Sequence, residues 1–131
     1  MEANLRRAEE RFAADPTDAR AFEALEEHYF LQGDWPELVR LYERRLEAPD
    51  LRASPETAAR LCFRLGQVLE ERCLQTDRAT EFYQEAARRA PRFRAPLTQL
   101  RRLYAAREAW DLVLQVAEVE AALPLQPFER A

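Results

Sequence analysis

Lysine and isoleucine are absent from this 131-residue chain, and glycine, serine and valine are scarce. Because β-branched residues favour strands, their scarcity excludes a β-sandwich or β-barrel and argues against a doubly wound sheet. Alanine, leucine, arginine and glutamate, which are strong helix formers, supply more than half of the residues. With 47% hydrophobic residues the chain is able to bury a core, which excludes a disordered chain. The composition therefore predicts an all-α protein.

Long apolar runs are also missing. No stretch approaches the roughly 18 apolar residues of a membrane-spanning helix, and residues 1–15 lack the apolar centre of a signal peptide. Cys62 and Cys73 fall in one expected helix, which separates them by about 16 Å, too far for a disulfide. These absences predict no membrane contact and a cytoplasmic location with reduced thiols. The lack of lysine and isoleucine beside abundant alanine and arginine is typical of a GC-rich bacterial genome.

Motifs that carry chemistry are scarce as well. His28 is the single histidine, serine occurs once, and the sequence has no glycine-rich phosphate loop. The spacing of the two cysteines is not that of a zinc site. The 20 arginines are interspersed with 24 acidic residues and the net charge is −4, so nucleic-acid binding is not expected. We expect no catalytic residue, no metal, no cofactor and no enzyme activity.

Proline and glycine divide the chain into helical stretches, with breaks at Pro16, Gly33–Pro36, Pro49–Pro55, Pro91–Pro96 and Pro124–Pro127. Between the breaks, apolar spacing predicts seven helices, over residues 2–14, 18–32, 35–48, 55–73, 76–90, 93–107 and 109–122. We expect N-caps at Asp18, Asp34 and Ser54 and a left-handed C-cap at Gly33. Loops of two to six residues make successive helices antiparallel, so the chain is predicted to form a string of helical hairpins.

An internal repeat appears when the sequence is compared with itself at a shift of 75 residues. Pro16 then coincides with Pro91, Leu25 with Leu100, Tyr29 with Tyr104 and Trp35 with Trp110. The segment between these two blocks supplies another hairpin of the same pattern. We expect the hairpins to stack and bury their apolar faces in one continuous core, with Trp35 and Trp110 filling the hairpin angle and Cys62 in the core.

This pattern resembles the tetratricopeptide repeat family. The unit 18–48 matches at Phe22, Leu25, Tyr29, Gly33, Trp35, Tyr42 and the following Pro49. The unit 55–90 matches at Leu65, Gly66, Ala79, Tyr83, Ala86 and the following Pro91, and the unit 93–122 at Leu97, Leu100, Tyr104, Trp110 and Val113. Glu26 and Arg101 replace the usual glycine, and Ala117 the usual aromatic. The resemblance implies one domain over 1–131, a right-handed α-solenoid of antiparallel helical hairpins.

In this family the first helices of the hairpins line a concave face that holds a peptide or a partner helix. The resemblance places these residues there: Arg20, Glu23, Glu27, Phe30, Arg60, Phe63, Arg64, Gln67, Gln99 and Arg102. Phe30 and Phe63 are candidate apolar anchors, with packing between hairpins as the alternative. Arg60, Arg64 and Arg102 are candidates to bind carboxylates or to pair with acidic residues of the chain itself. The Lys, Arg and Asn clamp of the chaperone-binding branch is absent.

The resemblance therefore implies a non-catalytic scaffold that binds a protein or peptide on its concave face. Residues 2–14 align with a second helix, so the first helix of that hairpin is missing, and the chain is expected to be a segment of a longer array. Both ends of the stack are then expected to expose apolar surface. The alternative function is self-assembly into homo-oligomers through the terminal helices.

Overall fold

The computed structural model describes residues 2–124, and every regular element in this range is helical. The order is α1 (Glu2–Ala14), α2 (Ala19–Gln32), α3 (Trp35–Leu46), the 3₁₀ helix η1 (Pro49–Ala53), α4 (Pro55–Glu71), α5 (Thr76–Arg89), α6 (Arg94–Ala106) and α7 (Trp110–Ala122). The seven expected α-helices are confirmed, and each boundary lies within two residues of its prediction. Part of the last expected break, Pro124–Pro127, lies outside the described residues.

Local caps mark the start of α2, its end at Gly33 and the start of α3. The side chain of Asp18 accepts a hydrogen bond from the Ala21 amide at 3.1 Å, as an N-cap does. Gly33 ends α2 with φ of 66°, the left-handed conformation that glycine adopts without a steric penalty. Ser54 precedes α4 as expected, but its side chain makes no capping bond. Here Pro55 in the first turn and the Ser54 carbonyl, which accepts from the Ala58 amide at 3.0 Å, begin the helix.

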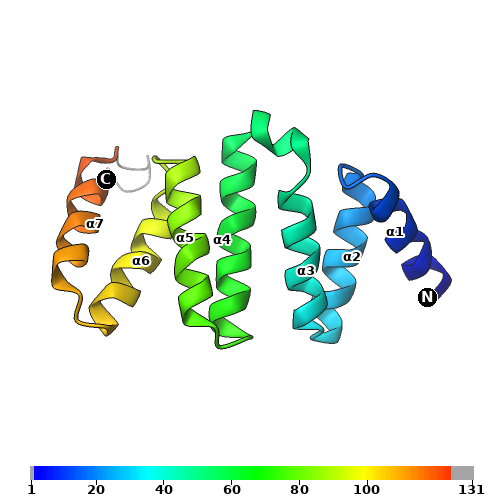
Figure 1. The fold of residues 1–131 in the computed structure, drawn as a ribbon, viewed down its shortest axis with the longest axis horizontal. Coiled ribbons are helices and arrows are strands. Elements are labelled where there is room, and N and C mark those ends of the chain that lie inside the picture. Colours follow the sequence, from blue (N-terminus) through cyan, green and yellow to red (C-terminus); the bar gives the residue numbers. More distant parts are fainter. Residues whose placement is uncertain (1, 125–131) are drawn as a thin grey trace, which may run out of the picture.

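The helices stand in one row in chain order, with α1 and α7 at opposite ends (Figure 1). Each helix packs against the next one along the chain, and the contact between α4 and α5 is the most extensive. Gly66 permits this close approach, because a Cβ there would lie 2.6 Å from Cε1 of the Tyr83 ring. The result is the stack of helical hairpins that the repeat predicted.

Ion pairs link helices that are not consecutive. Glu26 on α2 binds Arg64 on α4 at 3.0 Å, and Glu70 on α4 binds Arg102 on α6. Between the second helices of two hairpins, Glu43 of α3 binds a third arginine, Arg78 of α5, at 3.2 Å. First helices are thus tied to first helices and second helices to second helices along the row.

The two ends of the row differ, which corrects the expectation that both expose apolar surface. On α1 the apolar residues Leu5, Ala8 and Phe12 form one stripe that is used in packing against the core, and no large apolar side chain among its described residues is exposed. On α7, by contrast, Trp110 and Leu114 are 57% and 62% exposed. The expected plug at Trp110 is therefore wrong, since α7 faces the core with Leu112, Val113 and Val116 instead.

Candidate functional site: an acidic groove between α2 and α4

A hollow of about 530 Å³ lies where α2, α3 and α4 meet. Its lining, which we call the acidic groove, is Glu23, Glu26, Glu27, Phe30, Tyr42, Arg64, Gln67 and Val68. Five of the ten residues predicted from the sequence as a binding surface are in this list: Glu23, Glu27, Phe30, Arg64 and Gln67. Positions four residues apart share one face of a helix, which is how α2 brings Glu23 and Glu27 together.

Glu26 is the central polar group of the acidic groove. Its Oε2 atom accepts a hydrogen bond from the Tyr42 hydroxyl at 2.6 Å and another from Nη1 of Arg64 at 3.0 Å. Burial, together with this bond to Glu26, raises the pKa of the Tyr42 phenol well above its usual value, so the phenol stays protonated and donates. The sequence marks Glu26 only as a departure from the usual glycine, and neither Glu26 nor Tyr42 was predicted as a site residue.

The charge that the groove leaves available is negative. Within residues 2–124, Glu23 and Glu27 make neither a salt bridge nor a side-chain hydrogen bond, and both are exposed. Arg64 also lines the groove, but its charge is directed to Glu26. Two exposed carboxylates therefore face a ligand with no compensating cation from the described part of the chain.

Phe30 supplies the apolar side of the groove. Its side chain is 51% exposed, and its ring meets the Trp35 ring edge-on, with centroids 5.5 Å apart. Trp35 is itself held by the guanidinium of Arg72, 5.0 Å from the ring centroid. An aromatic side chain that is half exposed and supported from behind is suited to anchor an apolar group of a ligand.

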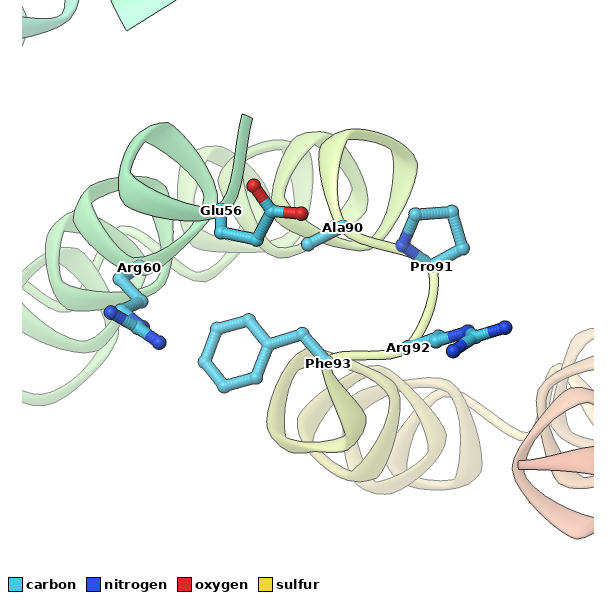
Figure 2. Close-up of a pocket in the computed structure, with 6 residues that line it drawn as sticks. All are labelled: Glu56, Arg60, Ala90, Pro91, Arg92 and Phe93. Carbon is cyan, nitrogen blue, oxygen red and sulfur yellow. The ribbon is translucent and has the colours of Figure 1, made fainter. Parts of the chain in front are cut away.

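A second hollow, of about 480 Å³, lies beside the start of α4 and the loop between α5 and α6. Figure 2 shows the Phe93 ring and the Arg60 side chain facing this space, while Arg92 points away from Arg60. Phe63 is not in its lining; this half-buried ring packs against Phe93 and Tyr83, with centroids 5.5 and 5.6 Å away. Phe63 thus packs between hairpins, which was the alternative to its role as an apolar anchor for a ligand.

Most of the remaining predicted site residues lie apart from the acidic groove. Arg102 donates to Gln99 at 3.0 Å and forms the ion pair with Glu70, so both predicted α6 residues belong to an arginine-centred cluster. Arg20 is exposed in the first turn of α2 and does not line the groove. Arg60 is not separated from the groove, because it also lines a hollow of about 280 Å³ together with Glu23 and Arg64.

The described residues give little support to chemistry at the cysteines or the histidine. Cys62 is buried as expected, and this burial raises the pKa of its thiol to about 11, which keeps it protonated at neutral pH. His28 packs edge-on against Tyr29. Residues 2–124 contain no set of three or more His, Cys, Asp or Glu side chains placed to hold a metal ion. Nor does this range contain a helix of the length and apolar character needed to cross a bilayer.

Comparison with protein families gives one match, between residues 21–56 and the model described as Tetratricopeptide repeat. The matched range holds most of α2, all of α3 and η1, and the first two residues of α4. No curated protein matches the chain. The matched segment lies in a row of consecutively packed helices, and the match together with this row supports a tetratricopeptide repeat assignment.

Proposed function

We propose that this chain is a non-catalytic protein-binding scaffold, and that the acidic groove binds a peptide or partner helix with a basic side chain next to an apolar one. Membership of a repeat family that generally mediates protein–protein contacts supports the first part. The observation that carries the second part is the pair of exposed carboxylates, Glu23 and Glu27, beside the half-exposed Phe30 ring.

The ion pairs of the groove indicate whether it prefers an acidic or a basic ligand. A carboxylate ligand at Arg64 or Arg102 would compete with Glu26 or Glu70, which already pair with these arginines. A lysine or arginine of the ligand meets Glu23 and Glu27 without breaking any contact in residues 2–124. Hydrogen bonds between charged groups contribute about 1.5–3 kcal/mol each, so this difference decides in favour of a basic ligand.

The experiment is selection of binders from a random peptide library displayed on phage, followed by affinity measurement on the selected sequences. We expect arginine or lysine adjacent to leucine, phenylalanine or methionine to be enriched. The double variant Glu23→Gln/Glu27→Gln should weaken binding of a selected peptide at least about tenfold, because two charge-assisted hydrogen bonds are lost. Binding should also weaken as salt concentration rises.

The matched control removes two charges elsewhere. Glu9 and Glu10 are both exposed on α1 and do not line the groove, so Glu9→Gln/Glu10→Gln should leave affinity within about twofold. Enrichment of acidic peptides, or equal affinities of the two double variants, would refute the proposed role of the groove. A Phe30→Ala variant that binds as tightly as the parent would remove the apolar anchor from the proposal.

Self-assembly through both terminal helices was the alternative expected from the sequence. Its structural basis is reduced, because of the two terminal helices α7 exposes large apolar side chains and α1 exposes none among its described residues. The exposed stripe on α7 needs a different explanation.

A further inference from the structure

An apolar stripe runs along the outer side of α7. It consists of Trp110, Leu114, Ala117 and Ala121, and we call it the α7 stripe. The spacing of i, i+4, i+7 and i+11 places these residues on one face of the helix, as in helices that dock on other helices. Trp110 and Leu114 are more than half exposed, and Ala121 is exposed as well.

The internal repeats show what happens to equivalent positions when another helix follows. The repeat aligns Leu114 with Val39 of α3 and Thr80 of α5, and both of these are only 6% exposed. The equivalents of Ala117, Tyr42 and Tyr83, pack against the first helix of their own hairpin, so this comparison rests on the position of Leu114. Helix α3 packs against α4 and α5 packs against α6, whereas no helix follows α7 in the described residues. The α7 stripe therefore corresponds to the face with which α3 and α5 contact the first helix of the next hairpin.

The charged residues of α7 indicate which kind of helix is able to dock on the α7 stripe. The sequence of α7 contains Asp111, Glu118 and Glu120 and no basic residue. Glu120 is held by Arg101 at 2.7 Å, while Asp111 and Glu118 are exposed, seven residues apart on the face next to the stripe. A docking helix would thus meet an apolar stripe with an acidic border.

We propose that the α7 stripe is a docking surface for an amphipathic helix of a partner protein, with arginine or lysine along the border of its own apolar stripe. A second copy of this chain fits less well. Two α7 stripes would bring Asp111 and Glu118 against their own copies, and α1 exposes no large apolar side chain among its described residues. This surface is separate from the acidic groove, so the proposal stands whether or not the groove binds a peptide.

The chain itself supplies two matched probes. Helix α6 is the first helix of its hairpin, and it contains three arginines and no acidic residue. A synthetic peptide of residues 92–107 therefore supplies an apolar and basic helical sequence. A peptide of residues 18–33 contains α2, which is also the first helix of its hairpin but whose charged residues are mainly acidic. The two peptides share the apolar spacing of the repeat and differ in the sign of their charge.

The readout is the fluorescence of Trp110 in the full chain. The chain has two tryptophans, so the variant Trp35→Phe leaves Trp110 as the only one, and neither peptide contains tryptophan. We expect the 92–107 peptide to shift the emission to shorter wavelength in a saturable and salt-sensitive way, because Trp110 becomes buried. The 18–33 peptide should bind at least tenfold more weakly. An absent shift with the basic peptide, or equal binding of both, would overturn the proposal.

Two further measurements separate docking on the stripe from other events. The variant Leu114→Asp should abolish the shift, whereas Leu74→Asp, at a residue 84% exposed in the loop before α5, should not change it. A shift that survives Leu114→Asp would mean that the peptide displaces α6 instead, and would refute docking on the stripe. If Trp110 already emits as a buried ring in the free chain, the stripe is occupied by the chain itself. The same emission only at high concentration would show occupation by a second copy. Either result would overturn a partner helix as the occupant.

Discussion

One position in the three hairpins shows how single residues adapt the repeat. In the middle hairpin Gly66 lies under the Tyr83 ring. In the first hairpin this position is Glu26, which binds the hydroxyl of the equivalent Tyr42. In the last it is Arg101, whose partner is Glu120, one turn further along a helix that has Ala117 in place of the tyrosine. The sequence shows these as departures from a motif, and the structure shows that each replacement makes a polar contact with the second helix of its own hairpin.

Gly66→Ala tests the close approach of α4 and α5. The new Cβ would lie 2.6 Å from the Tyr83 ring, and such overpacking costs about 1–3 kcal/mol. The higher helix propensity of alanine offsets up to about 1 kcal/mol of this. We expect a net loss of about 1–2 kcal/mol in the free energy of unfolding, measured by urea titration. In a Tyr83→Leu background the same substitution should cost less, and a Gly66→Ala chain more stable than the parent would contradict the steric argument.

At the scale of elements, α7 exposes more large apolar side chains than any other described helix, namely Trp110, Leu114 and Val119. Its contact with α6 combines the apolar residues Val113 and Val116 with one buried carboxylate. Glu120 is only 8% exposed, and it accepts bonds from Nε of Arg101 at 2.7 Å and from the hydroxyl of Thr98 at 3.2 Å. The attachment of α7 thus depends on a polar contact whose acceptor is largely withdrawn from water.

Arg101→Ala should therefore loosen α7. It leaves a mostly buried carboxylate without its cation, but Arg101 is itself 46% exposed, so solvent reduces the cost to about 1–2 kcal/mol. Amide hydrogen exchange read by mass spectrometry should speed up in α7 and stay unchanged in α2. The control Arg88→Ala removes a solvent-exposed arginine that pairs with Glu85 and should leave stability nearly unchanged. Unchanged exchange in α7 would show that Arg101 does not hold the helix.

At the scale of the whole molecule, the row of helices is asymmetric. Open-ended growth needs two complementary surfaces, one at each end, because a heterologous contact that does not close continues to add copies. Here α7 exposes its stripe, and α1 exposes no large apolar residue among those described. The asymmetry favours binding of a different helix over a filament of identical chains.

Light scattering after size exclusion tests this at concentrations spanning a hundredfold range. We expect a mass near 15.3 kDa at every concentration, because like charges border the apolar stripe of α7 and oppose pairing of two α7 helices. Leu114→Asp should leave that mass unchanged. A mass that grows past a dimer would contradict the asymmetry and restore self-assembly as the leading function.

The sequence by itself determined the helices and their repetition. Proline, glycine and the capping aspartates act within one turn of the chain, so their effect is readable without knowing the rest of the fold; Asp18 and Gly33 perform the predicted roles. The helical spacing of apolar residues also predicted that the hairpins stack. The 3₁₀ helix η1 was not predicted, and its segment appeared in the sequence only as a break between helices. The burial of its Leu51 depends on core residues that are distant in sequence.

Tertiary structure alone decided what each face of a helix meets. It placed Phe63 among aromatic rings, directed Arg64 and Arg102 to glutamates of neighbouring helices, and left Trp110 uncovered. Helical periodicity tells which side of a helix is apolar, but the partner of a side chain is chosen by how the hairpins are stacked. The acidic groove and the α7 stripe both arise at this level, because each is defined by which residues remain unpaired after the helices have packed.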